Sequence, residues 1–212
     1  MELPIFPLRV VLFPGRPLPV HVFEDRYRQM LTEVLEADRR FGIVAIRAGA
    51  AEDLAPSAFE VGCVSEVEQV TWLPHGRADV VARGVQRFRV QRWLEPAPYH
   101  RAEISPLADG DEIADPAKLA ALRELLVPYL QALGAPDELA SQLPDSPDHL
   151  AWLAAAAAQV GLEEQQSLLE QDSTTARIDD TVTLLRLETG LIRHFGSVGS
   201  LRPPGPNGAE LN

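Results

Sequence analysis

The chain has 212 residues, of which 46% are hydrophobic and 24% are charged, and its formal net charge is −12. This balance is typical of a folded soluble protein and excludes a disordered chain, and no apolar run reaches the ~18 residues that a membrane-spanning helix requires. The acidic excess argues against nonspecific binding of nucleic acid, because such binding depends on neutralising phosphates.

The scarcity of cysteine and lysine excludes several chemistries. Cys63, the one cysteine, can form neither an intrachain disulfide nor a cysteine-based zinc site, which fits a reducing cytoplasm. Lys118, the one lysine, lies in PAKLAAL rather than in a glycine-rich phosphate-binding loop. No histidine or carboxylate pattern typical of a metal site or a catalytic site occurs. We therefore expect no cofactor, no metal and no enzymatic activity.

The first half of the chain has the pattern of a β protein, with short apolar runs separated by turn residues. Short apolar runs at residues 3–8, 18–23 and 42–47 are rich in β-branched and aromatic side chains. Prolines bound or interrupt the first two runs, which predicts edge or irregular strands. Between the second and third runs, apolar residues recur with helical spacing, and this predicts a helix from about Asp25 to Ala37.

The clearest strand signal follows. Residues 62–73 alternate in polarity, and a turn at residues 74–77 leads into a return strand at residues 78–94. Gly84 is expected to mark a bulge or a bend in the return strand. With a last strand at residues 99–107, these short strands predict a small barrel or pseudo-barrel.

The pattern changes to helical after Leu107. Asp115-Pro116 and Ser146-Pro147 each place a capping residue before a proline at the first helical position. Helices are expected at residues 116–133, 149–161, 163–171 and 174–195, with a short helical piece from Pro136. The Pro/Gly-rich tail, residues 196–212, is expected to be disordered. We therefore predict an α+β protein with a β-rich subdomain at residues 1–108 and an α-helical bundle at residues 109–195.

The opening motif resembles that of a known family. LPIFPL at residues 3–8 is followed by Phe-Pro-Gly at 13–15 and by LPVHVFEDRY at 18–27. This pattern is similar to the N-terminal substrate-recognition domain of Lon proteases. Shorter matches share the same family pattern: FGIV at 41–44, VGCV at 61–64, RGVQRFRV at 83–90, Tyr99, and, in the helical half, Gln166, Leu168 to Glu170, and Arg177-Ile178.

The resemblance implies a PUA-like pseudo-barrel followed by a helical bundle in a bacterial, cytoplasmic protein. It implies non-enzymatic recognition of unfolded or degron-bearing polypeptides, as an adaptor with a protease or chaperone partner. Nothing here resembles the ATPase or Ser–Lys protease modules of a complete Lon protease, so we expect a stand-alone recognition domain. The family-motif residues are expected to be structural: Phe6, Pro7, Phe13, Pro14, Gly15, Phe23, Glu24, Arg26, Tyr27, Gly84, Arg87 and Phe88.

Two placements within the β-rich half are less obvious from the sequence. Glu24 is expected to pair with Arg87 or another barrel arginine and so to fix the helix to the barrel.

Apolar residues gather where a turn should be polar, at Trp72, Leu73, Pro74 and His75. These four residues are the candidate polypeptide-binding site, because exposed apolar patches mark interaction surfaces. The alternative is that they pack under the helical half.

A second function class is RNA or modified-nucleotide binding through the barrel. Arg83, Arg87 and Arg89 share parity on one expected strand and would form a basic face. No aromatic residue lies between them on that face, and acidic residues are abundant, so we favour a solvated or salt-bridged face. A small-molecule pocket is a third reading, and an enzyme is the least favoured, because no nucleophile with a base and an orienting group is visible.

Overall fold

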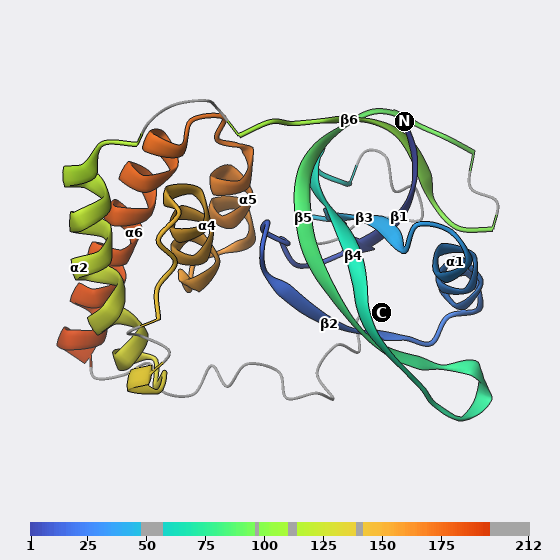
Figure 1. Ribbon diagram of the computed structural model, residues 1–212, viewed down its shortest axis with the longest axis horizontal. Coiled ribbons are helices and arrows are strands. Elements are labelled where there is room, and N and C mark those ends of the chain that lie inside the picture. The colour runs from blue at the N-terminus through green and yellow to red at the C-terminus, as the bar shows by residue number, and fades with distance from the viewer. Residues whose placement is uncertain (48–56, 96–97, 110–113, 139–141, 196–212) are drawn as a thin grey trace. The chain divides into compact units, whose positions relative to one another are not determined.

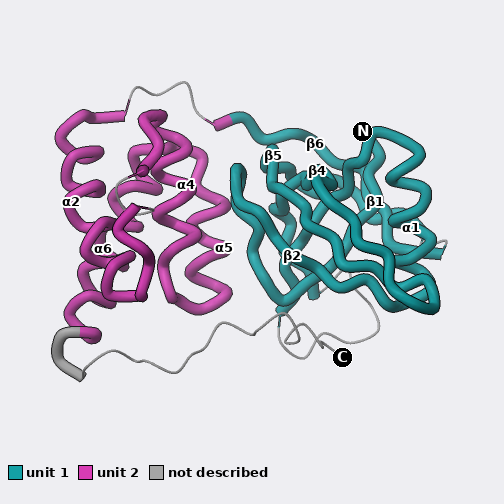
Figure 2. The backbone as a smooth tube through the Cα atoms, turned by 60° about the horizontal axis from the view of Figure 1, so that its bottom comes forward, with its two compact units in different colours: residues 1–108, 206–212 teal, residues 109–205 magenta. Residues whose placement is uncertain are grey.

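The computed structural model describes residues 1–47, 57–95, 98–109, 114–138 and 142–195. The chain divides between Ala108 and Asp109 into two compact units, which Figure 2 shows in different colours. We call them the N-terminal unit and the C-terminal unit and describe each by itself. The tail at residues 196–212, expected to be disordered, lies outside the described residues.

The described part of the N-terminal unit forms six strands and one long helix (Figure 1). The elements are β1 (Glu2–Leu8), β2 (Pro17–Val22), α1 (Asp25–Glu36), β3 (Arg40–Ala45), β4 (Val61–Trp72), β5 (Ala78–Trp93) and β6 (Arg101–Pro106). The strand order is β2-β5-β4-β3-β1-β6, and β5 also pairs with β6. This last pairing closes five strands into a ring and confirms the predicted pseudo-barrel.

The long strand β5 connects the parts of this sheet. One edge of β5 pairs with β4, and the other edge pairs first with β2 and then with β6, all antiparallel. Between these two segments the register with β4 shifts, so that Ser65 pairs with Gly84 whereas Val64 pairs with Gln86. The bulge expected at Gly84 is confirmed, and it bends β5 from one partner strand to the next.

The turn before β2 packs directly against this bulge. The amide of Gly15 donates to the carbonyl oxygen of Gly84 at 2.7 Å, and the amide of Gly84 donates to that of Arg16 at 2.9 Å. A Cβ added to Gly84 would lie 2.4 Å from the carbonyl oxygen of Phe13. Glycine is therefore required here by the close approach of two backbones.

Of the two alternatives predicted, an edge strand or an irregular strand, β2 is the edge strand and β1 is the irregular one. In the described residues β2 pairs with β5 alone, whereas β1 lies between β3 and β6. Residues Glu2–Pro4 of β1 pair with β6, and residues Ile5–Leu8 pair with β3. Each half of β1 therefore has one partner strand, which leaves an open side for a proline nitrogen that carries no hydrogen.

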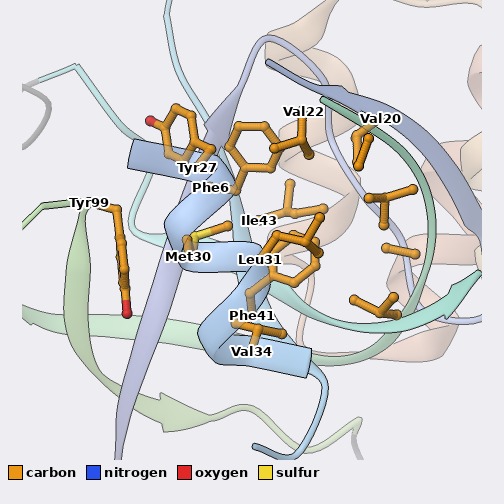
Figure 3. Close-up of a cluster of buried hydrophobic side chains, with 14 of the residues drawn as sticks. Phe6, Val20, Val22, Tyr27, Met30, Leu31, Val34, Phe41, Ile43 and Tyr99 are labelled. Atoms are coloured by element: carbon orange, nitrogen blue, oxygen red, sulfur yellow. The ribbon is translucent and has the colours of Figure 1, made fainter. Parts of the chain in front are cut away.

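Two apolar clusters stabilise the N-terminal unit. In one, side chains from all five strands of the ring surround the fully buried Phe88. The other joins α1 to the opposite face of the sheet, through Tyr27, Met30, Leu31 and Val34 (Figure 3). The ring centroids of Tyr27 and Phe6 lie 4.4 Å apart. Burial raises the pKa of Tyr27 to about 12.

The C-terminal unit is a helical bundle in its described residues. The helices are α2 (Pro116–Ala132), α4 (Pro147–Ala157), α5 (Leu162–Glu170) and α6 (Thr174–Phe195). Both predicted caps are confirmed: the Asp115 side chain accepts from the amide of Ala117 at 2.8 Å, and that of Ser146 from the amide of His149 at 3.5 Å. None of the described helices combines the length and apolar character needed to cross a membrane.

Helix α4 ends four residues earlier than the sequence predicts. The amide of Gln159, just beyond its end, donates to the Tyr129 hydroxyl at 3.0 Å and to the Glu188 carboxylate at 3.1 Å. These partners belong to α2 and α6, so the end of α4 is set by tertiary contacts. The short helical piece expected from Pro136 runs into residues 139–141, which lie outside the described residues.

A buried arginine organises the centre of the bundle. The guanidinium of Arg177 lies 3.4 Å from the ring centroid of Trp152 and donates to the carbonyl oxygen of Gln171 at 2.6 Å and of Leu168 at 3.3 Å. The Asp109 carboxylate accepts from Trp152 Nε1 at 3.3 Å and lies 3.7 Å from the guanidinium. Such a cation needs these partners because an unpaired buried charge is strongly destabilising.

Replacing Gly84 by alanine is expected to destabilise the protein by ~1–3 kcal/mol, because the new methyl group meets a backbone carbonyl that cannot move aside freely. Gly190 of α6 is the matched control, since a Cβ there meets nothing within 4 Å. Gly190→Ala should be neutral or stabilising by up to about 1 kcal/mol. Urea unfolding of both variants measures the difference, and equal stabilities would contradict the assigned close approach.

Candidate functional site

The tip of the β4–β5 hairpin is a tight, well-defined turn. Residues Pro74–Gly76 form a short 3-10 turn in which His75 and Gly76 have φ angles of 64° and 73°. The amide of Leu73 donates to the carbonyl oxygen of Arg77 at 2.8 Å and closes the turn. Figure 1 shows the hairpin extending past the other strands of the N-terminal unit.

Helix α1 holds this turn in place. The guanidinium of Arg28 donates to the carbonyl oxygen of His75 and to the carboxylate of Asp25. Arg77 adds a bond within the turn, from its Nε to the carbonyl oxygen of Pro74 at 3.3 Å. The tip backbone is therefore fixed at both ends of the turn, which lowers the entropy that a binding partner would have to remove.

The tip carries large apolar side chains in contact with solvent. The Trp72 residue is 53% exposed, Pro74 and His75 are exposed, and Leu73 is half-buried. Trp72 is paired with Ala78, and Ala78 with Val22 at the end of β2. The next residue, Phe23, is 40% exposed and its ring stacks on His21, with centroids 5.9 Å apart. We call Phe23 and residues 72–75 the tip surface.

Phe23 is the residue that the sequence interpretation misses. The family motif predicts a structural role for it, yet its side chain is exposed at the same end of the β2–β5–β4 ribbon as Trp72, on the other face of the ribbon. A signal was available: Phe23 has the parity of His21, which is half-buried, and not that of the buried Val20 and Val22.

Most of the other family-motif residues are buried. The seven buried ones are Phe6, Phe13, Pro14, Tyr27, Gly84, Arg87 and Phe88. Pro7 and Glu24 are half-buried, and Gly15 and Arg26 are exposed. This distribution supports a structural role for most of the motif, in contrast to the tip surface.

The expected pair between Glu24 and a barrel arginine is not formed. The carboxylate of Glu24 instead pairs with Arg26 at 2.6 Å, two residues along the chain. Arg87 is buried and donates to the carbonyl oxygen of Ala108 at 3.0 Å. The helix is fixed to the sheet by apolar packing and by Arg28.

The structure also removes the basic face that favoured nucleic acid. Arg87 is only 1% exposed, so it cannot share a solvent-facing surface with Arg83 and Arg89. Arg83 pairs with Glu68, and the Arg89 guanidinium lies 3.6 Å from the Glu60 carboxylate. The bulge beside Gly84 changes the side to which residues point, which breaks the parity assumed for these arginines.

Metal ligands do not gather in the part of the chain that the structure describes. No group of three or more His, Cys, Asp or Glu side chains there could hold a metal ion. At the tip end, a close histidine–carboxylate contact joins His21 Nδ1 to Asp79 Oδ1 at 2.7 Å. The tip surface instead offers exposed apolar side chains on and beside a rigid turn.

Arg28→Ala is expected to loosen the tip, because the carbonyl oxygen of His75 loses its charged hydrogen-bond donor. A hydrogen bond to a charged group contributes about 1.5–3 kcal/mol. Amide hydrogen exchange should quicken roughly tenfold at Leu73, whose amide closes the turn. Arg40→Ala is the control, since Arg40 pairs with Glu66 on the exposed surface. Unchanged exchange at Leu73 in the Arg28 variant would show that α1 does not hold the tip.

Comparisons with known proteins match most of this chain to one family. Residues 2–186 match the family described as "ATP-dependent protease La (LON) substrate-binding domain". A Lon protease of Anaeromyxobacter dehalogenans is 28% identical over 206 residues, which are 93% of this chain and 24% of that protein. A Lon protease of Desulfovibrio desulfuricans is 30% identical over 88% of this chain and 22% of its own length. The chain thus spans about a quarter of these relatives.

Solved structures share the fold. The Lon N-terminal domain protein from Xanthomonas campestris aligns with a TM-score of 0.69 and 25% identity, covering 86% of this chain and 98% of that one. The N-terminal domain of the Mycobacterium avium complex Lon protease aligns with a TM-score of 0.70 and 20% identity, covering 88% and 98%. The mixed fold predicted from the sequence is therefore confirmed.

Proposed function

This chain belongs to the ATP-dependent protease La (LON) substrate-binding domain family, and from this premise we propose that it binds unfolded or degron-bearing polypeptides through the tip surface. A family of substrate-binding domains supports a recognition module as the general function. The choice of the tip surface rests on one observation: Trp72 is exposed beside the turn that α1 holds rigid, and Phe23 is exposed at the same end of the ribbon, on its other face.

The chemistry of the tip suits apolar segments. Covering a half-exposed aromatic side chain contributes roughly 1 kcal/mol, about half the value for complete burial. A few such contacts give weak, sequence-tolerant binding. Residues 1–108 contain 13 basic and 14 acidic side chains, so the N-terminal unit has a net charge of only −1 and does not select strongly for charged ligands. Apolar segments become available when a protein unfolds, which makes unfolded chains the expected substrates.

Strand addition is a less suitable mode of binding, because the edge of β2 that pairs with no described strand carries prolines. The amide of Gly84 bonds to Arg16, so by alternation Leu18, Val20 and Val22 bond to β5 while Pro17, Pro19 and His21 face outward. Proline has no N–H, so the outer edge of β2 offers one donor, that of His21. The proposed recognition therefore works through side chains at the tip.

The proposal assigns no catalytic step to this domain. It includes an adaptor role in the cytoplasm, in which a bound polypeptide is passed to a protease or chaperone partner. This part rests on the relatives that are named Lon proteases. Weak binding is compatible with such a role, because a substrate has to be released to be passed on.

The tip surface is tested with fluorescein-labelled α-lactalbumin that has been reduced and carboxymethylated so that it stays unfolded. The double variant Phe23→Ser, Trp72→Ser is expected to bind it at least tenfold more weakly in fluorescence anisotropy, since tenfold corresponds to about 1.4 kcal/mol. Native α-lactalbumin should not bind.

Val85→Ser provides the matched control. Val85 is 40% exposed, like Phe23, but lies in the middle of β5. This variant should bind the unfolded probe with unchanged affinity, and thermal unfolding should show all variants folded. If Val85→Ser weakens binding as much as the double variant does, binding is not localised to the tip and the proposal fails.

The proline edge generates a separate prediction. The variant Pro17→Val, Pro19→Val restores two outward N–H groups on an apolar edge, so it should associate through β2 as its concentration rises. Light scattering and size-exclusion chromatography measure this association. The variant Pro17→Val, Pro19→Lys restores the same donors but adds a charge that opposes edge pairing, and it should stay dispersed. Association of both variants, or of neither, would contradict the role given to the prolines.

A further inference from the structure

Helix α6 presents leucines on the face opposite to its core residues. Ile178, Val182 and Leu185 are buried in the C-terminal unit. Leu187 and Leu191, by contrast, are 63% and 53% exposed, and Leu184 on the same side is half-buried. We call Leu184, Leu187 and Leu191 the α6 seam. Isolated exposed leucines are common, but these three recur at i, i+3 and i+7 on one helix face.

This spacing is that of a helix-pairing seam. Apolar residues alternating at three and four positions form the a and d sites that accept side chains of a second helix. The residues beside the seam permit close approach: Thr183 is small and uncharged, and a Cβ added to Gly190 would meet nothing within 4 Å. The shape of the seam therefore favours a helical partner over an extended one.

The net charge of the C-terminal unit, together with Asp180 on the seam side of α6, restricts the partner further. Residues 109–195 contain 16 acidic and five basic side chains. Asp180 lies seven residues before Leu187 and hence on the seam side of α6, and its carboxylate accepts from the neutral amide of Gln171 at 2.6 Å. A partner helix with basic flanks would supply the cation that Gln171 does not.

A second copy of this chain fits the seam poorly. Two acidic units repel each other, whereas a helix with basic flanks is attracted to the same unit. We propose that the α6 seam docks an amphipathic helix of a partner protein, with an apolar a/d stripe and Lys or Arg on its flanks. This inference concerns the C-terminal unit and does not depend on the function proposed for the tip surface.

Three synthetic peptides test the proposal with the full chain. The first has leucine at the a and d positions and lysine or arginine on the flanks. The second has the same leucines with glutamate flanks, and the third has the composition of the first in scrambled order. In fluorescence anisotropy at physiological salt, the first peptide should bind at least tenfold more tightly than either of the others.

Variants then localise the binding. Leu187→Ser, Leu191→Ser should weaken binding of the basic amphipathic peptide at least tenfold, while Phe23→Ser, Trp72→Ser should leave it unchanged. Equal binding of the scrambled peptide would reduce the effect to net charge, and an unaffected leucine variant would place the site elsewhere; either result overturns the proposal. So would concentration-dependent dimerisation of the chain that the leucine variant abolishes, because the occupant would then be a second copy.

Discussion

The pairing of β5 with three other strands is the constraint on which the N-terminal unit depends. Its first segment lies between β2 and β4, and its second between β4 and β6, so one continuous strand closes the ring and also carries the hairpin beyond it. The change of partner occurs at Gly84, where the absence of a side chain lets the turn at Phe13 approach. The same strand also places the tip near α1. Strands β2, β5 and β4 form one ribbon that ends at Trp72, and α1 begins three residues after the end of β2.

A rigid support of this kind suits the proposed binding surface, which would recognise apolar side chains rather than a particular sequence. The side chains of the tip surface offer apolar area, while the turn beneath them is held by Arg28 and by its own hydrogen bonds. Binding of this kind does not order the receptor, so even small apolar contacts contribute to affinity. The prolines of β2 suit the proposed function as well, because a domain that binds unfolded chains is exposed to strand addition at an unpaired edge.

Local signals in the sequence predict most of the elements, whereas long-range contacts decide the features that the sequence misses. The alternation at residues 62–73 and the caps at Asp115 and Ser146 act over a few residues, and all three are confirmed. The inner position of β1, the early end of α4 at Gln159 and the burial of Arg87 each depend on partners distant in sequence. At the candidate site, Trp72 is visible as an apolar residue in a turn. The alternation of β2 indicates that Phe23 points away from the core, but its place at the same end of the ribbon as Trp72 depends on a strand register that no local pattern contains.

The most direct test of the tip surface is site-specific photo-crosslinking to an unfolded polypeptide. A benzophenone side chain is placed at position 72 in one protein and at position 85 in another, each is irradiated with carboxymethylated α-lactalbumin, and adducts are quantified by mass spectrometry. Our account predicts abundant adducts from position 72, few from position 85, and competition by excess unlabelled unfolded protein. Equal yields from the two positions, or none from position 72, would contradict it.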